Sequence, residues 1–168
     1  MSCILRCGFR YDLAVRAKAD GRLLAIERAR PNRVPQEGLD DMAQVYLKGG
    51  AGPAGLFIGL WAGAHQPDGQ ETAASFASLV TEVVHYSQAG RLPLELGSVA
   101  AGACSNAAAL ARFDVMGAAT VNGAFLSTVQ AKGATSGKLL SVVRFANPRA
   151  VDETVYLEVL SGFQFVSL

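Results

Sequence analysis

The stretch 121–145, VNGAFLSTVQAKGATSGKLLSVVRF, decides the fold class predicted for this chain. Two runs of strand-forming residues enclose a segment of small residues and lysine, residues 127–137. Side chains in the first run alternate between two faces, which is the period of two of a β-strand. One face carries Val121, Gly123, Phe125 and Ser127, and the other Asn122, Ala124 and Leu126. The stretch therefore predicts a hairpin whose connection is a flexible, exposed tip.

The same rhythm extends on both sides of this hairpin. Four further strand candidates lie in the second half of the chain: residues 98–105, 108–116, 139–145 and 155–167. The apolar run GLFIGLW, residues 55–61, predicts a buried strand. Residues 73–79 fit a turn or two of helix, and residues 80–86 have strand composition. Short strands with turn signals at this spacing indicate an antiparallel β-sandwich, here expected to be jelly-roll-like.

One short helix is expected over residues 35–48, beginning at Pro35 and ending before Gly49. Its acidic residues gather near the start and Lys48 lies at the end, as the helix dipole favours. Apolar residues recur at spacings of three and four, which predicts one core-facing side. These residues are Leu39, Met42, Ala43, Tyr46 and Leu47.

The first 31 residues predict a β-hairpin arm in front of a sandwich domain over residues 32–168. Phe9, Tyr11, Leu13 and Val15 alternate with polar residues, and Asp20-Gly21 suits a two-residue hairpin turn. This end is rich in arginine, which fits either a solvated outer face or an arm lying on an acidic partner. Partner-binding candidates are Arg6, Arg10, Arg16, Arg22, Arg28, Arg30, and, in the connection at 127–138, Lys132 and Lys138.

Composition limits the classes of function. The chain has 168 residues, 15 basic against 14 acidic, and 17% charged residues. This balance argues against a nucleic-acid binder that relies on a broad basic field. No apolar stretch is long enough to span a membrane, and the N-terminus does not have the pattern of a signal peptide. Small apolar residues at this density suit tight β packing and burial against other subunits, although a GC-rich genome gives the same bias.

No catalytic constellation, cofactor site or metal site emerges from the residues, so an enzyme is not expected. Cys3 and Cys7 have no second Cys or His pair to complete a zinc site. Cys104 lies in an Ala-rich strand, where a small buried thiol is favoured over a nucleophile. His65, near Asp68 and Glu71, offers at most a weak metal site, and His85 reads as a structural histidine on a strand. The glycine-rich stretches match no phosphate-binding loop.

Several segments, taken in order, resemble small virion structural proteins of tailed bacteriophages and prophages. The resemblance covers about residues 32–166 and rests on the order of the segments more than on any one of them. It departs where Leu92 separates Arg91 from Pro93, and where Asp152-Glu153 stands in place of Gly-Asp. The matching segments are NRVPQEGLDDMAQVYLKGG, GLFIGLW, TEVVHYSQAGRLPLELG, SNAAALARFDVMGAATVNGAFLST, GATSGKLLSVVRF and AVDETVYLEVLSGFQF.

The resemblance implies a capsid decoration (cement) protein, assembled in the host bacterial cytoplasm into the virion and bound to the major capsid (coat) protein. It implies a homodimer or homotrimer, with neither membrane nor direct nucleic-acid contact. Two alternatives stay open. One is a tail, neck or fibre-base component of the virion, and the other is a carbohydrate-binding or hydrolytic β-sandwich.

Overall fold

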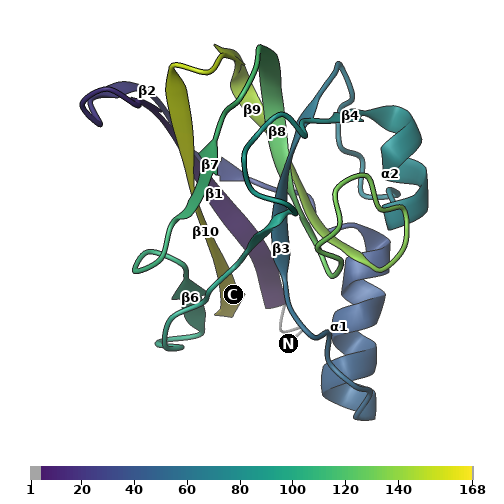
Figure 1. Ribbon diagram of the computed structural model, residues 1–168. Coiled ribbons are helices and arrows are strands. Elements are labelled where there is room, and N and C mark those ends of the chain that lie inside the picture. Colours follow the sequence, from purple (N-terminus) through teal and green to yellow (C-terminus); the bar gives the residue numbers. More distant parts are fainter. Residues whose placement is uncertain (1–4, 168) are drawn as a thin grey trace.

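The structure is a computed structural model that describes residues 5–167, with side chains described for residues 7–28 and 32–165. Two antiparallel β-sheets face each other, and helices α1 and α2 lie on the side of the second sheet (Figure 1). The fold class predicted from the alternation pattern, mainly β with an antiparallel sandwich, is confirmed. The one helix expected is joined by a second, over the residues where a short turn of helix was considered.

The first sheet, sheet A, brings the two ends of the chain together. Its order is β2-β1-β10-β6, and β7 also pairs with β10. β1 and β10 are antiparallel over their whole lengths, from Leu5 opposite Ser167 to Ala17 opposite Val155. The bounds are β1 Leu5–Ala17, β2 Leu23–Pro31, β6 Ala103–Ser105, β7 Ala111–Asp114 and β10 Val155–Ser167.

The N-terminal hairpin is therefore present, and its first strand is an inner strand of sheet A, between β2 and β10. Its alternation is as expected, because Tyr11 and Leu13 are fully buried on the inner face. The connection is longer than a two-residue turn: the Ala17 amide donates to the Arg22 carbonyl at 3.0 Å, which encloses residues 18–21. The expectation of an arm separate from the domain is revisited below.

The second sheet, sheet B, contains the two strands of the stretch at 121–145. Its order is β4-β3-β8-β9, and β5 also pairs with β3. β4 and β5 are only two residues long, so the strand composition at residues 80–86 yields mostly irregular backbone. The bounds are β3 Phe57–Ala62, β4 Thr81–Glu82, β5 Leu92–Pro93, β8 Ala119–Ser127 and β9 Leu139–Val151.

Both faces of sheet B are buried. The inner face packs on sheet A through side chains such as Leu126 and Val143, opposite Leu13 and Leu157. The outer face has its own aromatic cluster, in which Phe76 of α2 (Ala73–Leu79) packs edge-on against Phe125, with ring centroids 5.4 Å apart. This explains why the strands at 55–61 and 121–127 are apolar or small on both sides.

Glycine permits the tight packing of the outer face at two points. A Cβ on Gly59 would lie 2.2 Å from the Phe125 ring, and one on Gly123 would lie 2.1 Å from the Val143 carbonyl oxygen. Neither distance is compatible with a side chain. The close approach that only glycine allows therefore lets Phe125 and Trp61 lie flat on the sheet.

Helix α1 (Gln36–Lys48) is joined to both α2 and β9 by one carboxylate. Glu37 accepts hydrogen bonds from the backbone amides of Ala73 and Leu139, both at 2.8 Å. The helix follows Pro35 and ends at Gly49, which has φ 67°. Only its first half lies on the sandwich, and its second half projects beyond it (Figure 1).

The predicted core-facing side of α1 is wrong. Tyr46 and Leu47 are 87% and 76% exposed, and Leu39 is 38% exposed. The side that packs on the sheet is centred on Gly38, whose Cα lies so close to Leu140 that an added Cβ would stand 2.9 Å from the Leu140 Cα. A glycine contact does not register as an apolar position in a periodicity count, which is why the face was misassigned.

Candidate functional site

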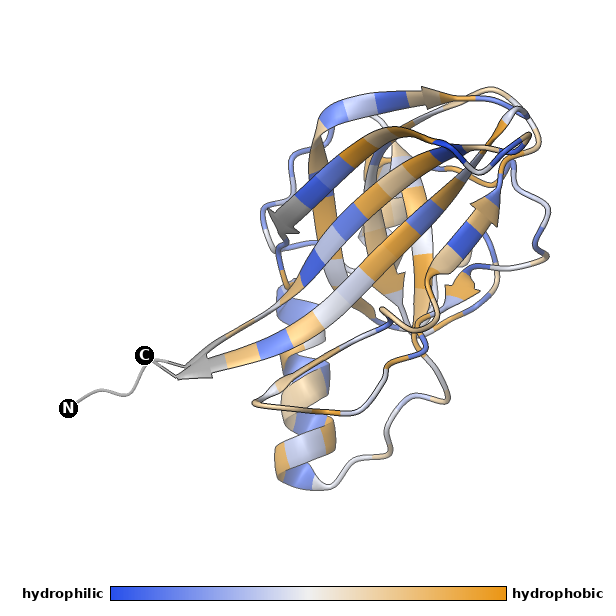
Figure 2. Cartoon of the chain, turned by 90° about the vertical axis from the view of Figure 1, so that its left-hand side faces the viewer, coloured by the Kyte–Doolittle hydropathy of each residue, from blue (hydrophilic) through white to orange (hydrophobic). Residues whose placement is uncertain are grey.

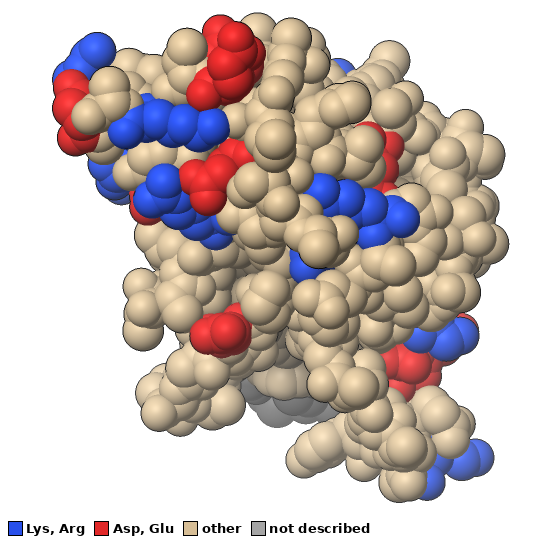
Figure 3. All heavy atoms as spheres, viewed as in Figure 1, with Lys and Arg blue, Asp and Glu red and all other residues tan. Residues whose placement is uncertain are grey.

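The predicted partner-binding arginines do not form a basic surface. Arg16 Nε donates to Glu158 Oε2 at 2.6 Å, and Arg22 lies 3.7 Å from Asp20. Arg10 is 67% exposed at its side chain and stands 4.0 Å from Asp12, and Arg28 is exposed. Figure 3 shows red and blue side by side over this part of the molecule. The side chains of Arg6 and Arg30 lie outside the described residues.

Lys132 is also engaged within the chain. Its ammonium group donates to the Val84 and Tyr86 carbonyl oxygens, both at 3.0 Å, and lies 3.7 Å from the centroid of the Tyr86 ring. Burial lowers the pKa of Lys132, and the nearby Glu82 carboxylate partly opposes that shift. Lys138, by contrast, is half exposed and stands 4.0 Å from Glu37. Of these two lysines, Lys138 is the more accessible to a partner.

The connection 128–138 is anchored rather than free, and Arg91 is its main anchor. The guanidinium of Arg91 forms a two-point ion pair with Glu82, with both N–O distances 2.9 Å. It also donates to the Val129 and Ala134 carbonyls and to the Ser127 hydroxyl. All five N–H donors of this buried arginine are thereby used. The expectation of a flexible tip is corrected by these contacts.

A pocket of about 340 Å³ lies between α2 and this connection. Its apolar lining comes from Phe76, Phe125 and Leu139, and its polar wall from Glu82 and Arg91. Because the Arg91 donors are already bonded and Glu82 also accepts from the Gly133 amide at 2.7 Å, the wall has little left to offer an anion. The pocket has the character of a packing gap beside a structural ion pair.

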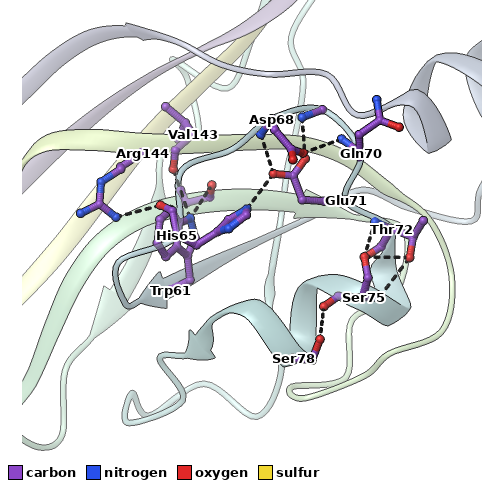
Figure 4. A network of polar contacts seen from close by, with 12 residues as sticks. Trp61, His65, Asp68, Gln70, Glu71, Thr72, Ser75, Ser78, Val143 and Arg144 are labelled. Atoms are coloured by element: carbon purple, nitrogen blue, oxygen red, sulfur yellow. Dashed lines mark hydrogen bonds and ion pairs between the residues drawn. The ribbon is translucent and has the colours of Figure 1, made fainter.

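His65 and Glu71, considered as weak metal ligands, contact each other (Figure 4). His65 Nε2 lies 2.7 Å from Glu71 Oε1, and Glu71 also accepts from the amides of Asp68 and Gly69, both at 2.9 Å. Arg144 donates to the His65 carbonyl oxygen at 3.0 Å. The Glu71 carboxylate is fully buried, so these contacts satisfy its charge and fix the loop over Trp61. This network was not foreseen, since its members come from a loop and from β9.

The remaining candidates for chemistry stand apart from one another. Cys104 lies on β6 and Cys7 on β1, both as free thiols of intermediate exposure. His85 is exposed and lies outside the strands, so its assignment as a strand histidine is wrong. Among the residues the structure describes, no group of three or more His, Cys, Asp or Glu side chains is placed to hold a metal ion.

The candidate functional surface is instead an apolar end of the molecule. We define the apolar end as Leu96, Val99 and Phe165, which are 38%, 74% and 49% exposed. The Phe165 amide donates to the Gly102 carbonyl at 2.9 Å, so the β10 end and the turn after Val99 touch. Both lie at the same end of the sandwich as the chain termini and the tip of α1 (Figures 1 and 2).

Backbone strain marks the turn at this end. The amides and carbonyls of Ala100 and Ala103 bond each other at 2.9 Å around a two-residue turn with φ 48° at Ala101 and 73° at Gly102. Turns with two positive φ values favour Asn or Gly, and Ala101 is the one non-glycine residue with positive φ among those described. A strained turn that presents an exposed Val99 is typical of a binding loop.

Comparisons with known proteins add no family to this description. The chain matches no protein-family model, and a search of curated proteins gives no significant match. Among the described residues, neither helix is long and apolar enough to cross a membrane.

Proposed function

We propose that this protein is a structural component of a tailed-bacteriophage virion, a decoration (cement) protein that attaches to the major coat protein of the capsid. The observation that carries the proposal is the apolar end, where Leu96, Val99 and Phe165 face solvent together. The order of the segments that resemble virion proteins supplies the family context. The interface is assigned to the apolar end rather than to the arginines of the first 31 residues.

Physical considerations support an interface of this kind. Association surfaces are centred on apolar and aromatic side chains, with charged residues depleted at the centre. The described arginines and lysines near the N-terminal hairpin are largely paired with carboxylates of the same chain, so they offer little net charge to a partner. A modest patch is sufficient on a shell, because many copies bound to a repeating lattice gain from avidity.

The test is attachment to phage shells that have been assembled without this protein. Wild-type protein, Val99→Asp and Leu79→Asp are mixed with shells, and the copies bound per shell are counted after sedimentation. Leu79 is a matched control, because it is 46% exposed and lies at the end of α2. We expect Val99→Asp to weaken attachment at least tenfold and Leu79→Asp to leave it unchanged.

Two outcomes would overturn the proposal. Equal attachment of wild-type protein and Val99→Asp would show that the apolar end is not the interface. Wild-type protein that ignores shells but binds purified tails would assign it to the tail, neck or fibre base.

A further inference from the structure

Helix α1 has two apolar sides, and only one of them is covered. At 100° per residue, Gly38, Met42 and Val45 form one side, which is buried or half-buried. The opposite side, which we call the α1 seam, is open. The α1 seam consists of Leu39, Ala43, Tyr46 and Leu47.

The position of α1 in the fold leaves this seam without a partner in the described chain. The Gly38 contact holds the first half of the helix against β9, and the second half projects past the sheet (Figure 1). Tyr46 and Leu47 are the two most exposed large apolar side chains described, at 87% and 76%. Adjacent large apolar residues on a projecting helix mark an interaction surface rather than scattered surface residues.

The α1 seam is complementary to itself when a second helix runs antiparallel. With a two-fold axis at Ala43, Leu39 of one copy lies opposite Leu47 of the other, and the small Ala43 side chains allow the helices to approach closely. Two-fold contacts of this type use the same patch on both copies.

The charges of α1 fit the same arrangement. Asp40, in the first half of the helix, is exposed beside the seam, and Lys48 is exposed at the last position. In the antiparallel pair, Lys48 of each copy reaches the level of Asp40 of the other. A parallel pair would instead place like charges together, which is unfavourable.

We infer that α1 pairs with α1 of a second copy of this chain, antiparallel and centred on Ala43. Two helices of this length bury less than the roughly 1,200 Å² of a stable interface, so the isolated dimer is weak and concentration-dependent. The inference does not rest on the proposed function, because it is tested on the purified protein alone and uses residues outside the apolar end.

The first experiment is sedimentation velocity over a concentration series from micromolar to millimolar. We expect wild-type protein to shift from monomer to dimer, Leu47→Asp to raise the dissociation constant at least tenfold, and the exposed control Leu79→Asp to match wild type. Circular dichroism confirms that each variant is folded. A wild-type chain that stays monomeric throughout, or a dimer indifferent to Leu47→Asp, overturns the inference.

Charge exchange tests the antiparallel orientation. Lys48→Glu places like charges opposite Asp40 and should weaken the dimer severalfold. Adding Asp40→Lys to Lys48→Glu restores opposite charges and should recover much of the loss. A double variant no tighter than Lys48→Glu would contradict the antiparallel pairing.

Cross-linking tests the position of the two-fold axis. In a chain with Cys3, Cys7 and Cys104 changed to Ser, Ala43→Cys should form a disulfide-linked dimer under mild oxidation. Ala74→Cys provides the matched control, because Ala74 is an exposed alanine on the other helix, α2. Equal cross-linking of the two variants would show that copies do not meet at Ala43.

Discussion

Tyr11 is a fully buried phenol in the core between the two sheets. Burial raises its pKa to about 12, and the neighbouring Ser141 and Ser161 hydroxyls reduce the shift. In the unfolded chain the group ionises near pH 10. The stabilisation from the neutral phenol is therefore complete below pH 10 and is lost as pH rises from about 10 to 12.

We expect the unfolding free energy of the wild-type protein to fall between pH 9 and 11 more steeply than that of Tyr11→Phe. The contribution of one such group approaches ~1.4 kcal/mol per pH unit within the window. Urea titrations at both pH values measure the difference. Tyr46→Phe, at an exposed tyrosine, should keep the wild-type slope, and a Tyr11→Phe profile parallel to wild type would contradict the assignment.

Phe125 tests the second cluster, on the outer face of sheet B. Its side chain is 3% exposed and packs against Phe76 of α2. Phe125→Ala should lower the unfolding free energy by ~3–5 kcal/mol, as expected for an aromatic core residue. Phe165→Ala, at a half-exposed phenylalanine, should cost clearly less in the same denaturant titration. Equal losses would mean that α2 does not form a packed layer.

At the scale of elements, Arg91 controls the order of the connection 128–138. Arg91→Met keeps part of the apolar stem but removes the donors to Val129 and Ala134, and leaves Glu82 without its cation. Breaking a buried pair in this way should cost ~3–5 kcal/mol. Hydrogen exchange at residues 128–138 should also speed up.

The exposed pair Arg112–Asp114 supplies the control for Arg91. The Arg112 side chain is 51% exposed, so Arg112→Met should cost no more than ~1 kcal/mol. If the two variants lose the same stability and exchange in the connection is unchanged, Arg91 is not the anchor.

The elements with a strong period were predictable from sequence, and the exceptions have physical causes. The alternation in residues 9–15 and 121–126 gave the correct strands because each side chain has a fixed face. The strand expected at 80–86 fails because the carbonyls of Val84 and Tyr86 accept from Lys132 rather than from a neighbouring strand. Such a long-range side-chain contact has no signature in the local sequence.

At the scale of the molecule, the first 31 residues contribute β1 and β2 to sheet A. Removing residues 1–31 would expose the β10 edge and the buried side chains Leu157 and Val159. We expect residues 32–168 alone to lose cooperative unfolding and to aggregate, as measured by circular dichroism and light scattering. A soluble fragment that melts cooperatively would restore the division into an arm and a separate domain.

The candidate surface was less predictable than the fold. Positions for Lys132 and the arginines were chosen by charge, yet charge alone does not reveal which carboxylate or carbonyl each group meets. The apolar end and the α1 seam combine residues whose exposure depends on packing elsewhere, such as the Gly38 contact that turns Leu47 outward. Exposure is a property of the whole fold, so it could not be read from those residues.

The pairing of Leu5 with Ser167 has a practical consequence for engineering. Since both ends of the backbone meet beside the apolar end (Figure 1), a cargo fused to either of them would crowd the same surface. A circular permutant that joins the old ends with a short linker and opens within the exposed residues 107–110 would move both fusion points. Displayed cargo could then be attached without covering Val99 and Phe165.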